Sequence, residues 1–292
     1  MKNTIKPLVI GVTLAAMSSP AMALSWYTPF TVFEDDNLDF VVDNGDGVLS
    51  IGDRLISVAE FNNTQGILAG QGPSAIIDSG VEITAVADVT IIAAVETAAG
   101  SGEFNFVFGA SGAAGLLSGY AAGTALVAFS DASPDLDVIN ANCGTRASCL
   151  TLAGLGLADG STEFLSAGFF GDLDASWVSS SFNSGATIAV VEGGNASTKF
   201  GSFNFSLDIG INNTGWDLVD QNCSPFCTGA GDSMIALTGS GDILGGQGLA
   251  DYNEWTARSD TDVQVAPIPE PVTLGLLGAG LLAFGGLRRK KA

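Results

Sequence analysis

The stretches Phe104-Asn105-Phe106-Val107-Phe108 and Phe203-Asn204-Phe205-Ser206-Leu207 place a large apolar side chain at every second position. Successive side chains of a β-strand point to opposite faces, so this period of two predicts strands with one buried and one solvated face. Similar short runs, bounded by Gly, Asn, Asp and Ser, occur at Val81 to Ala85, Thr187 to Val191 and Met234 to Leu237. The enrichment in Phe, Val, Ile and Thr favours strands over helices.

Helical periodicity is weak, and its best short example outside the chain ends is Leu55 to Phe61. Many short strands and few helices predict an all-β fold, either a β-sandwich or a jelly-roll. The body of the chain, residues 24–266, has the length of one large domain or two small ones, and we expect a single β-rich extracellular domain. No fixed-period repeat is present, which argues against a propeller or a solenoid.

The charge of this body is strongly acidic. The body contains 30 acidic and 4 basic residues, a net charge of −26, because six of the ten Lys and Arg residues lie near the chain ends. Such a surface repels phosphate backbones, so we expect no nucleic-acid partner. It attracts cations, although solubility outside a cell explains the same composition.

Four cysteines, Cys143, Cys149, Cys223 and Cys227, lie in the same body. An even number in an exported chain predicts two disulfides, and of the three connectivities we expect the local pairs, Cys143 with Cys149 and Cys223 with Cys227. Zinc binding is the alternative. It is disfavoured because the chain has no histidine and both pairs are wider than the usual C-x2-C spacing.

The N-terminus has the three parts of a secretory signal peptide. Lys2 and Lys6 precede the apolar run Leu8 to Ala16, and the small-residue pattern Ala21-Met22-Ala23 follows. This order predicts a signal peptide over residues 1–23, with cleavage after Ala23. The apolar run is shorter than the ~20 residues that span a bilayer, which disfavours a permanent anchor.

The C-terminal segment, residues 267–292, also has three parts. A proline-rich stretch comes first, then an uncharged run over residues 272–287, then a basic tail over residues 288–291. The uncharged run would reach ~24 Å as a helix, which is slightly short of a ~30 Å hydrocarbon core. We expect a single transmembrane helix with the basic tail in the cytoplasm and the acidic body outside the inner membrane. The residues that define this arrangement are Pro269, Glu270, Pro271, Arg288, Arg289, Lys290 and Lys291.

This order resembles the PEP-CTERM sorting signal of Gram-negative bacteria. The resemblance covers only the last two dozen residues of the chain. It implies processing by an exosortase, a membrane peptidase, in a species that makes extracellular polysaccharide. It therefore implies export across the inner membrane, a transient anchor there, and a final place at the cell surface or in the extracellular matrix.

A candidate calcium loop lies at Val42 to Asp53. On a twelve-position EF-hand-like or dockerin-like loop, the ligand positions fall on Asn44, Asp46, Val48 (through its carbonyl), Ser50 and Asp53, with Gly47 at the sharp turn. Val42 stands where an aspartate is usual, and Asp43 beside it is the nearest substitute. A simple hairpin turn is the alternative, because Asn, Asp and Gly favour turns on backbone grounds alone.

Aromatic residues and paired acids are weaker candidates for a site. The Trp and Tyr residues could form platforms for sugar rings, but core packing explains each of them better. Trp216 and Trp255, beside Asp217 and Glu254, are the first candidates for aromatic residues at the surface. Acidic pairs could support glycoside hydrolysis if they lie ~5–9 Å apart in space. The acids considered for such a pair are Asp131, Asp135, Asp137, Asp172 and Asp174.

These patterns predict an exported, non-enzymatic protein with a structural or adhesive role linked to extracellular polysaccharide and biofilm. One alternative is a calcium-dependent carbohydrate-binding module that uses the loop from Asn44 to Asp53. The other is a polysaccharide-modifying hydrolase that uses a carboxylate pair.

Overall fold

A computed structural model describes most of the body of the chain. The described residues are 31–66, 74–75, 81–132, 134–138, 143–157, 160–215, 217–225, 227, 230–249 and 254–266. The predicted signal peptide 1–23 and the sorting segment 267–292, with its helix 272–287 and basic tail, lie outside them. Among the described residues, no helix has both the length and the apolar character needed to cross a membrane.

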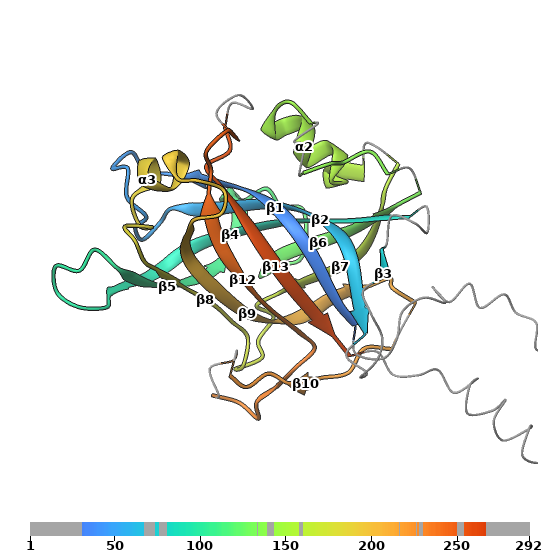
Figure 1. Ribbon diagram of the computed structural model, residues 1–292. Coiled ribbons are helices and arrows are strands. Elements are labelled where there is room, and N and C mark those ends of the chain that lie inside the picture. Colours follow the sequence, from blue (N-terminus) through green and yellow to red (C-terminus); the bar gives the residue numbers. More distant parts are fainter. Residues whose placement is uncertain are drawn as a thin grey trace, which may run out of the picture.

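The described residues form one closed antiparallel sheet in which most strands that follow one another in sequence are hydrogen-bonded neighbours (Figure 1). The strands of the ring are β1 (Thr31–Val42), β2 (Arg54–Gly66), β4 (Glu82–Glu96), β5 (Phe104–Ala110), β6 (Thr124–Asp131), β7 (Thr162–Gly168), β8 (Ser176–Ser181), β9 (Lys199–Asn212), β12 (Leu237–Gly245) and β13 (Ala257–Val265). Pairing of β1 with β13 along most of both strands closes the ring into a barrel.

Two of the eight positions in this barrel wall are filled by interrupted strands. β5 and β6 follow one another along the same edge of β4, and β8 and β7 do the same along β9. β5 pairs with β8, and β6 pairs with β7. The wall therefore contains, in order, β1, β2, β4, β5/β6, β7/β8, β9, β12 and β13.

The remaining elements decorate this barrel. They are β3 (Ser74–Ala75) beside β2, the small pair β10 (Gln221–Asn222) and β11 (Met234–Ile235), the helices α2 (Arg146–Leu152) and α3 (Ile188–Gly193), and the 3-10 turns η2 (Gly112–Ala114) and η3 (Leu155–Leu157). Helix α3 lies at one end of the barrel, and α2 lies over its side (Figure 1).

The all-β prediction is confirmed, but the β-sandwich or jelly-roll is wrong, because the strands close into one sheet instead of two packed layers. Two local predictions are also wrong. Leu55 to Phe61 is part of β2, and Thr187 to Val191 leads into and forms most of α3. In the second case the β-branched run is helical because Val191 packs against Phe200 and Ala257 at the barrel end, and tertiary packing overrides the local preference.

The outer face of the barrel wall carries a second apolar cluster. Leu38, Val58 and Val127 point outward from the barrel and are buried under the segment 143–157, which contains α2. The disulfide between Cys143 and Cys149 lies in this covering segment. The second disulfide joins Cys223 and Cys227, so both predicted local pairings are confirmed.

Candidate functional site

The barrel encloses a cavity at the end where α3 lies. The opposite end is filled by buried side chains that include Phe33, Leu207, Leu237 and Val265. The α3 end leaves about 1080 Å³ that no atom of the chain occupies, counting the part that opens to solvent. Part of this space is open solvent at the mouth, so the enclosed room is smaller and suits a small molecule.

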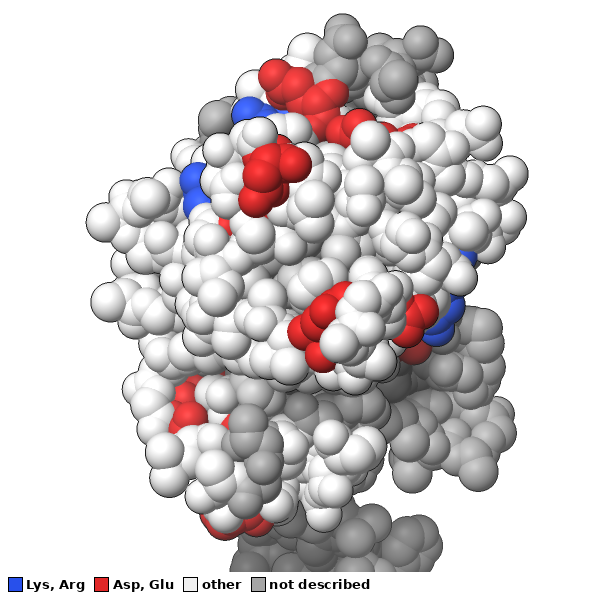
Figure 2. Space-filling view, turned by 90° about the vertical axis from the view of Figure 1, so that its left-hand side faces the viewer, with Lys and Arg blue, Asp and Glu red and all other residues white. Residues whose placement is uncertain are grey.

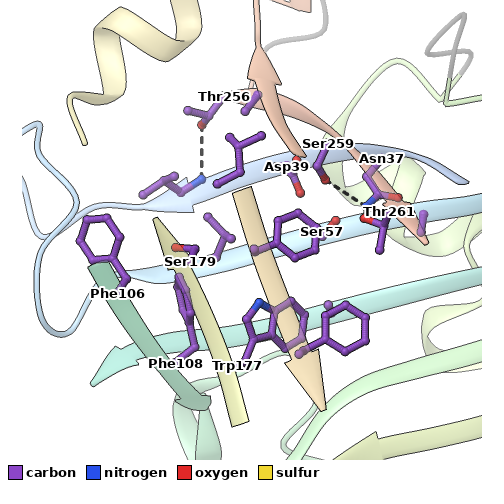
Figure 3. A pocket seen from close by; sticks show the side chains of 18 of the residues that line it. Asn37, Asp39, Ser57, Phe106, Phe108, Trp177, Ser179, Thr256, Ser259 and Thr261 are labelled. Carbon is purple, nitrogen blue, oxygen red and sulfur yellow. Dashed lines mark hydrogen bonds between the residues drawn. The ribbon is translucent and has the colours of Figure 1, made fainter. Parts of the chain in front are cut away.

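Aromatic side chains form one wall of the cavity (Figure 3). Trp177 on β8 is buried, and its ring centroid lies 4.7 Å from that of Phe205 and 6.3 Å from that of Phe203. Phe108 on β5 completes this group, 6.4 Å from Trp177. The alternating positions of β5 and β9 that predicted strands therefore supply the apolar lining.

Polar side chains form a row on the wall made by β1, β2 and β13 (Figure 3). Asn37 donates hydrogen bonds from Nδ2 to Ser259 Oγ at 3.0 Å and to Thr261 Oγ1 at 2.7 Å. Asp39 lies in the same row, with Ser57 directly opposite it on β2, and Ser259 stands on β13 opposite Asn37, two positions along β1. A small number of placed polar groups in an apolar lining is typical of a site that orients a ligand.

Asp39 is the one charged residue among the described residues that line the cavity, and it is 5% exposed. Burial raises its pKa to about 6, and this rise is partly offset by the hydroxyls of Ser57 and Ser259. Ser57 Oγ lies near enough to the carboxylate to lower its pKa, yet the atom is buried and has no partner in hydrogen-bond geometry.

The cavity mouth is built from α3 and the β1–β2 loop, which meet at the same end of the barrel (Figure 1). Leu49 N donates to Ala186 O at 2.8 Å, and Ile188 N donates to Gly47 O at 3.1 Å. Leu49, Ile188 and Val191 also line the cavity. The predicted calcium loop is therefore part of the mouth.

Within the β1–β2 loop, ligand atoms from three carboxylates, Asp43, Asp46 and Asp53, lie within 4.8 Å of one another, so the cluster could hold a metal ion. Asp46 and Asp53 belong to the predicted ligand set, and Asp43 replaces the missing first position. Desolvation opposes ionisation of Asp43, but backbone N–H groups, that of Gly47 foremost, lower its pKa. Gly45, Gly47 and Gly52 adopt positive φ angles, which explains the glycine spacing of the loop.

The other predicted ligands make hydrogen bonds inside the loop. Asn44 Nδ2 donates to Ser50 Oγ at 2.7 Å, and Asn44 Oδ1 accepts from Asp46 N. Asp53 is buried and accepts from the backbone N–H groups of Asn44 and Ser50. Val48 N donates to Asp46 Oδ1. The loop is thus internally bonded around Asp53.

The remaining acidic candidates are spread over the outside of the barrel. Asp174 is fully buried and accepts from Gly231 N and Ser233 N, which holds the segment that follows the second disulfide. Asp131 and Asp135 lie with Glu82 in a second group able to hold a metal ion. None of these acids lines the cavity. On one face of the molecule, acidic side chains stand in small separate groups between uncharged residues (Figure 2).

No protein-family model matches this chain, and no curated protein or solved structure matches it closely enough to count as a relative. The cavity is therefore interpreted from its own residues alone.

The sequence did not single out the cavity residues. Trp177 belongs to the general set of aromatic residues, and Asp39 stands in no motif. Trp255, which was expected at the surface, is instead 4% exposed in the cluster on the outer barrel face. Its neighbour Glu254 is exposed, so the polarity of one sequence neighbour was a poor guide to the position of the Trp255 side chain. Trp216 lies outside the described residues.

Proposed function

We propose that this protein is a binding protein whose barrel holds a small, largely apolar molecule. The observation that supports the proposal is the lined cavity at the α3 end, opposite a barrel end that is filled by side chains. Aromatic and aliphatic side chains make most of its surface. Most of the polar groups lie on the wall made by β1, β2 and β13, and Ser179 and Ser181 on β8 are the others. An apolar interior of this kind suits a small hydrophobic ligand better than a chain of sugars.

Titration with N-phenyl-1-naphthylamine, a neutral dye that brightens in apolar surroundings, tests this proposal. The full chain should bind the dye with saturation. Ala87→Phe should weaken binding at least tenfold, because Ala87 lines the cavity and the added ring would fill it. Ala189→Phe, on the exposed side of α3, is the matched control and should bind as the unmodified chain does.

Circular dichroism of each variant separates a filled cavity from a misfolded chain. If Ala87→Phe does not fold, Ser179→Leu is used as the cavity-filling variant instead, because Ser179 lines the cavity from β8. The proposal fails if the unmodified chain does not bind the dye, or if a folded cavity-filling variant binds it undiminished.

Calcium at the β1–β2 loop is a second proposal, supported by the three carboxylates that converge there. Asp43, Asp46 and Asp53 would hold the ion, and the ion would brace one side of the cavity mouth. Calcium should raise the melting temperature of the unmodified chain and leave that of Asp46→Ala unchanged. Asp217→Ala, also exposed, is the control and should keep the response. An equal rise of the melting temperature in Asp46→Ala would exclude this loop as the calcium site.

Export and exosortase sorting also stay proposals, supported by the order of motifs at the two chain ends. Two disulfides in the described domain are in keeping with an oxidising compartment. The mass of the protein recovered from its source tests this proposal: it should begin at Leu24 and lack the basic tail. A structural or adhesive role in extracellular polysaccharide, calcium-dependent glycan binding and polysaccharide hydrolysis likewise remain predictions.

A further inference from the structure

We propose that the ligand of this cavity is an organic cation, a molecule with an ammonium-type nitrogen on an apolar body, and that Asp39 binds the nitrogen. This inference rests on the proposed function, because it names the chemical class of the molecule that the barrel holds.

The first observation is an uncompensated carboxylate inside the barrel. In the part of the chain that the structure describes, the residues that line the cavity include Asp39 but no Lys or Arg, and no ion pair involves Asp39. A buried carboxylate without a counter-charge is costly, because burial removes it from water. A ligand that brings a positive charge would remove this cost when it binds. A neutral ligand would leave it, and an anionic ligand would increase it.

The second observation concerns hydrogen bonding around Asp39. Ser259 Oγ accepts from Asn37, and a hydrogen bond from the Ser259 side chain to the Asp39 carboxylate lowers the pKa of Asp39. Ser57 Oγ lies near the same carboxylate and has no partner in hydrogen-bond geometry. An ammonium group has three donors and no acceptor. It could donate to the Asp39 carboxylate and to Ser57 Oγ together.

The third observation is the position of the aromatic wall. β8 is four strands from β1 in either direction around the ring, so Trp177 lies on the wall opposite Asp39. Trp177, Phe203 and Phe205 supply a continuous apolar surface there. A molecule that places its nitrogen at Asp39 would lay its apolar body against these rings, which also attract cations through their faces.

Competition against the bound dye tests the inference with three ligands of equal chain length. Dodecylammonium, 1-dodecanol and dodecanoate differ only in the charge and hydrogen bonding of the head group. On the full chain at pH 7 and below the micelle-forming concentrations, dodecylammonium should displace the dye at a concentration at least tenfold lower than 1-dodecanol. Dodecanoate should be the weakest competitor.

Asp39→Asn is the test variant, because it keeps the shape of the side chain and removes its charge. In this variant, the concentration of dodecylammonium that displaces the dye should lie within about threefold of the concentration of 1-dodecanol that does so. Asp260→Asn is the matched control: Asp260 lies on β13 next to Ser259 but is exposed on the outside, so the preference should persist. This control, repeated at high salt, separates binding at Asp39 from general attraction to the acidic surface.

Lowering the pH through about 6 should weaken the preference for dodecylammonium, because protonated Asp39 no longer pairs with a cation. No other titratable side chain lines the cavity among residues 31–266 as far as the structure describes them. Dye binding with equal competition by all three ligands, or a preference that survives Asp39→Asn, would overturn the inference and leave the proposed function standing. Absence of binding by the dye and by dodecylammonium alike would overturn both.

Discussion

Glu82 offers a sharp test of how this acidic chain tolerates buried charge. It lies at the start of β4, is 3% exposed, and accepts a hydrogen bond from Leu136 N at 3.1 Å. Glu60 on β2 is similarly buried and accepts from Val138 N at 3.0 Å. Burial raises the pKa of each carboxyl to about 7, against an ordinary value of 4.5. The ion pairs among the described residues include neither.

The direction of the pH effect follows from these values. Between about pH 4.5 and pH 7 the folded chain binds more protons at Glu82 than the unfolded chain does, so stability falls as the pH rises through this window. Above about pH 7, Glu82 is ionised in the folded chain and the full loss of folding stability is present. A shift of about 2.5 pKa units corresponds to about 3.4 kcal/mol at 1.36 kcal/mol per unit, as an upper bound. Glu82→Gln removes the charge but keeps one oxygen that accepts hydrogen bonds. We therefore expect it to raise the free energy of unfolding at pH 8 by about 1–3 kcal/mol.

Urea unfolding followed by circular dichroism at pH 5 and pH 8, with a chelator present, measures this effect. At pH 5, about half a pH unit above the ordinary pKa of 4.5, the variant and the unmodified chain should differ by less than about 1 kcal/mol, because little of the cost has yet developed. Glu192→Gln, exposed on α3, is the control and should change neither value. Equal destabilisation by Glu82→Gln at both pH values would refute the reasoning, since it would mean that the ionised form is favoured by its hydrogen bonds.

Three further variants test the packing of the barrel through urea unfolding. Asp88→Ala should lower the free energy of unfolding by about 3–5 kcal/mol. The buried carboxylate of Asp88 pairs with Arg54 at 2.6 Å, and its removal leaves the Arg54 charge without this partner. A loss below about 1 kcal/mol would contradict this reasoning. Gly168→Ala should cost about 1–3 kcal/mol, because a Cβ there would overlap the backbone of the adjacent β6 strand, whereas Gly119→Ala meets no atom within 4 Å and should be neutral. Replacement of both Cys143 and Cys149 by Ser, which leaves the other disulfide intact, should cost about 2 kcal/mol in the same assay.

The strands could be predicted from the sequence where only one of their faces is apolar. β5 and β9 alternate cleanly, since Phe106, Phe203 and Phe205 point into the barrel and their neighbours point away from it. β2 does not, because Ile56 and Val58 on its outer face are also buried, under the segment that contains α2. Two buried faces remove the period of two, and the same residues then fit a helical pattern.

Closure of the sheet could not be predicted, because a sandwich and a barrel require the same alternation within each strand. The difference lies in which strands pair, and the pairing of β1 with β13 joins residues more than 200 positions apart. The cavity was missed for the same reason: Asp39 and Trp177 come together only when the ring is closed. The β1–β2 loop was accessible to prediction because its Asn, Asp and Gly residues act within a dozen positions.

Energy transfer from tryptophan to the bound dye tests the central claim most directly, since it reports where the ligand lies. Trp177 lines the cavity, whereas Trp255 is buried in the cluster on the outer barrel face. If the barrel interior binds the ligand, Trp177→Phe should lower the transferred emission more than Trp255→Phe does, because Trp177 is the nearer donor. Loss of the transfer in Trp255→Phe, with full transfer in Trp177→Phe, would place the ligand outside the barrel and contradict the account.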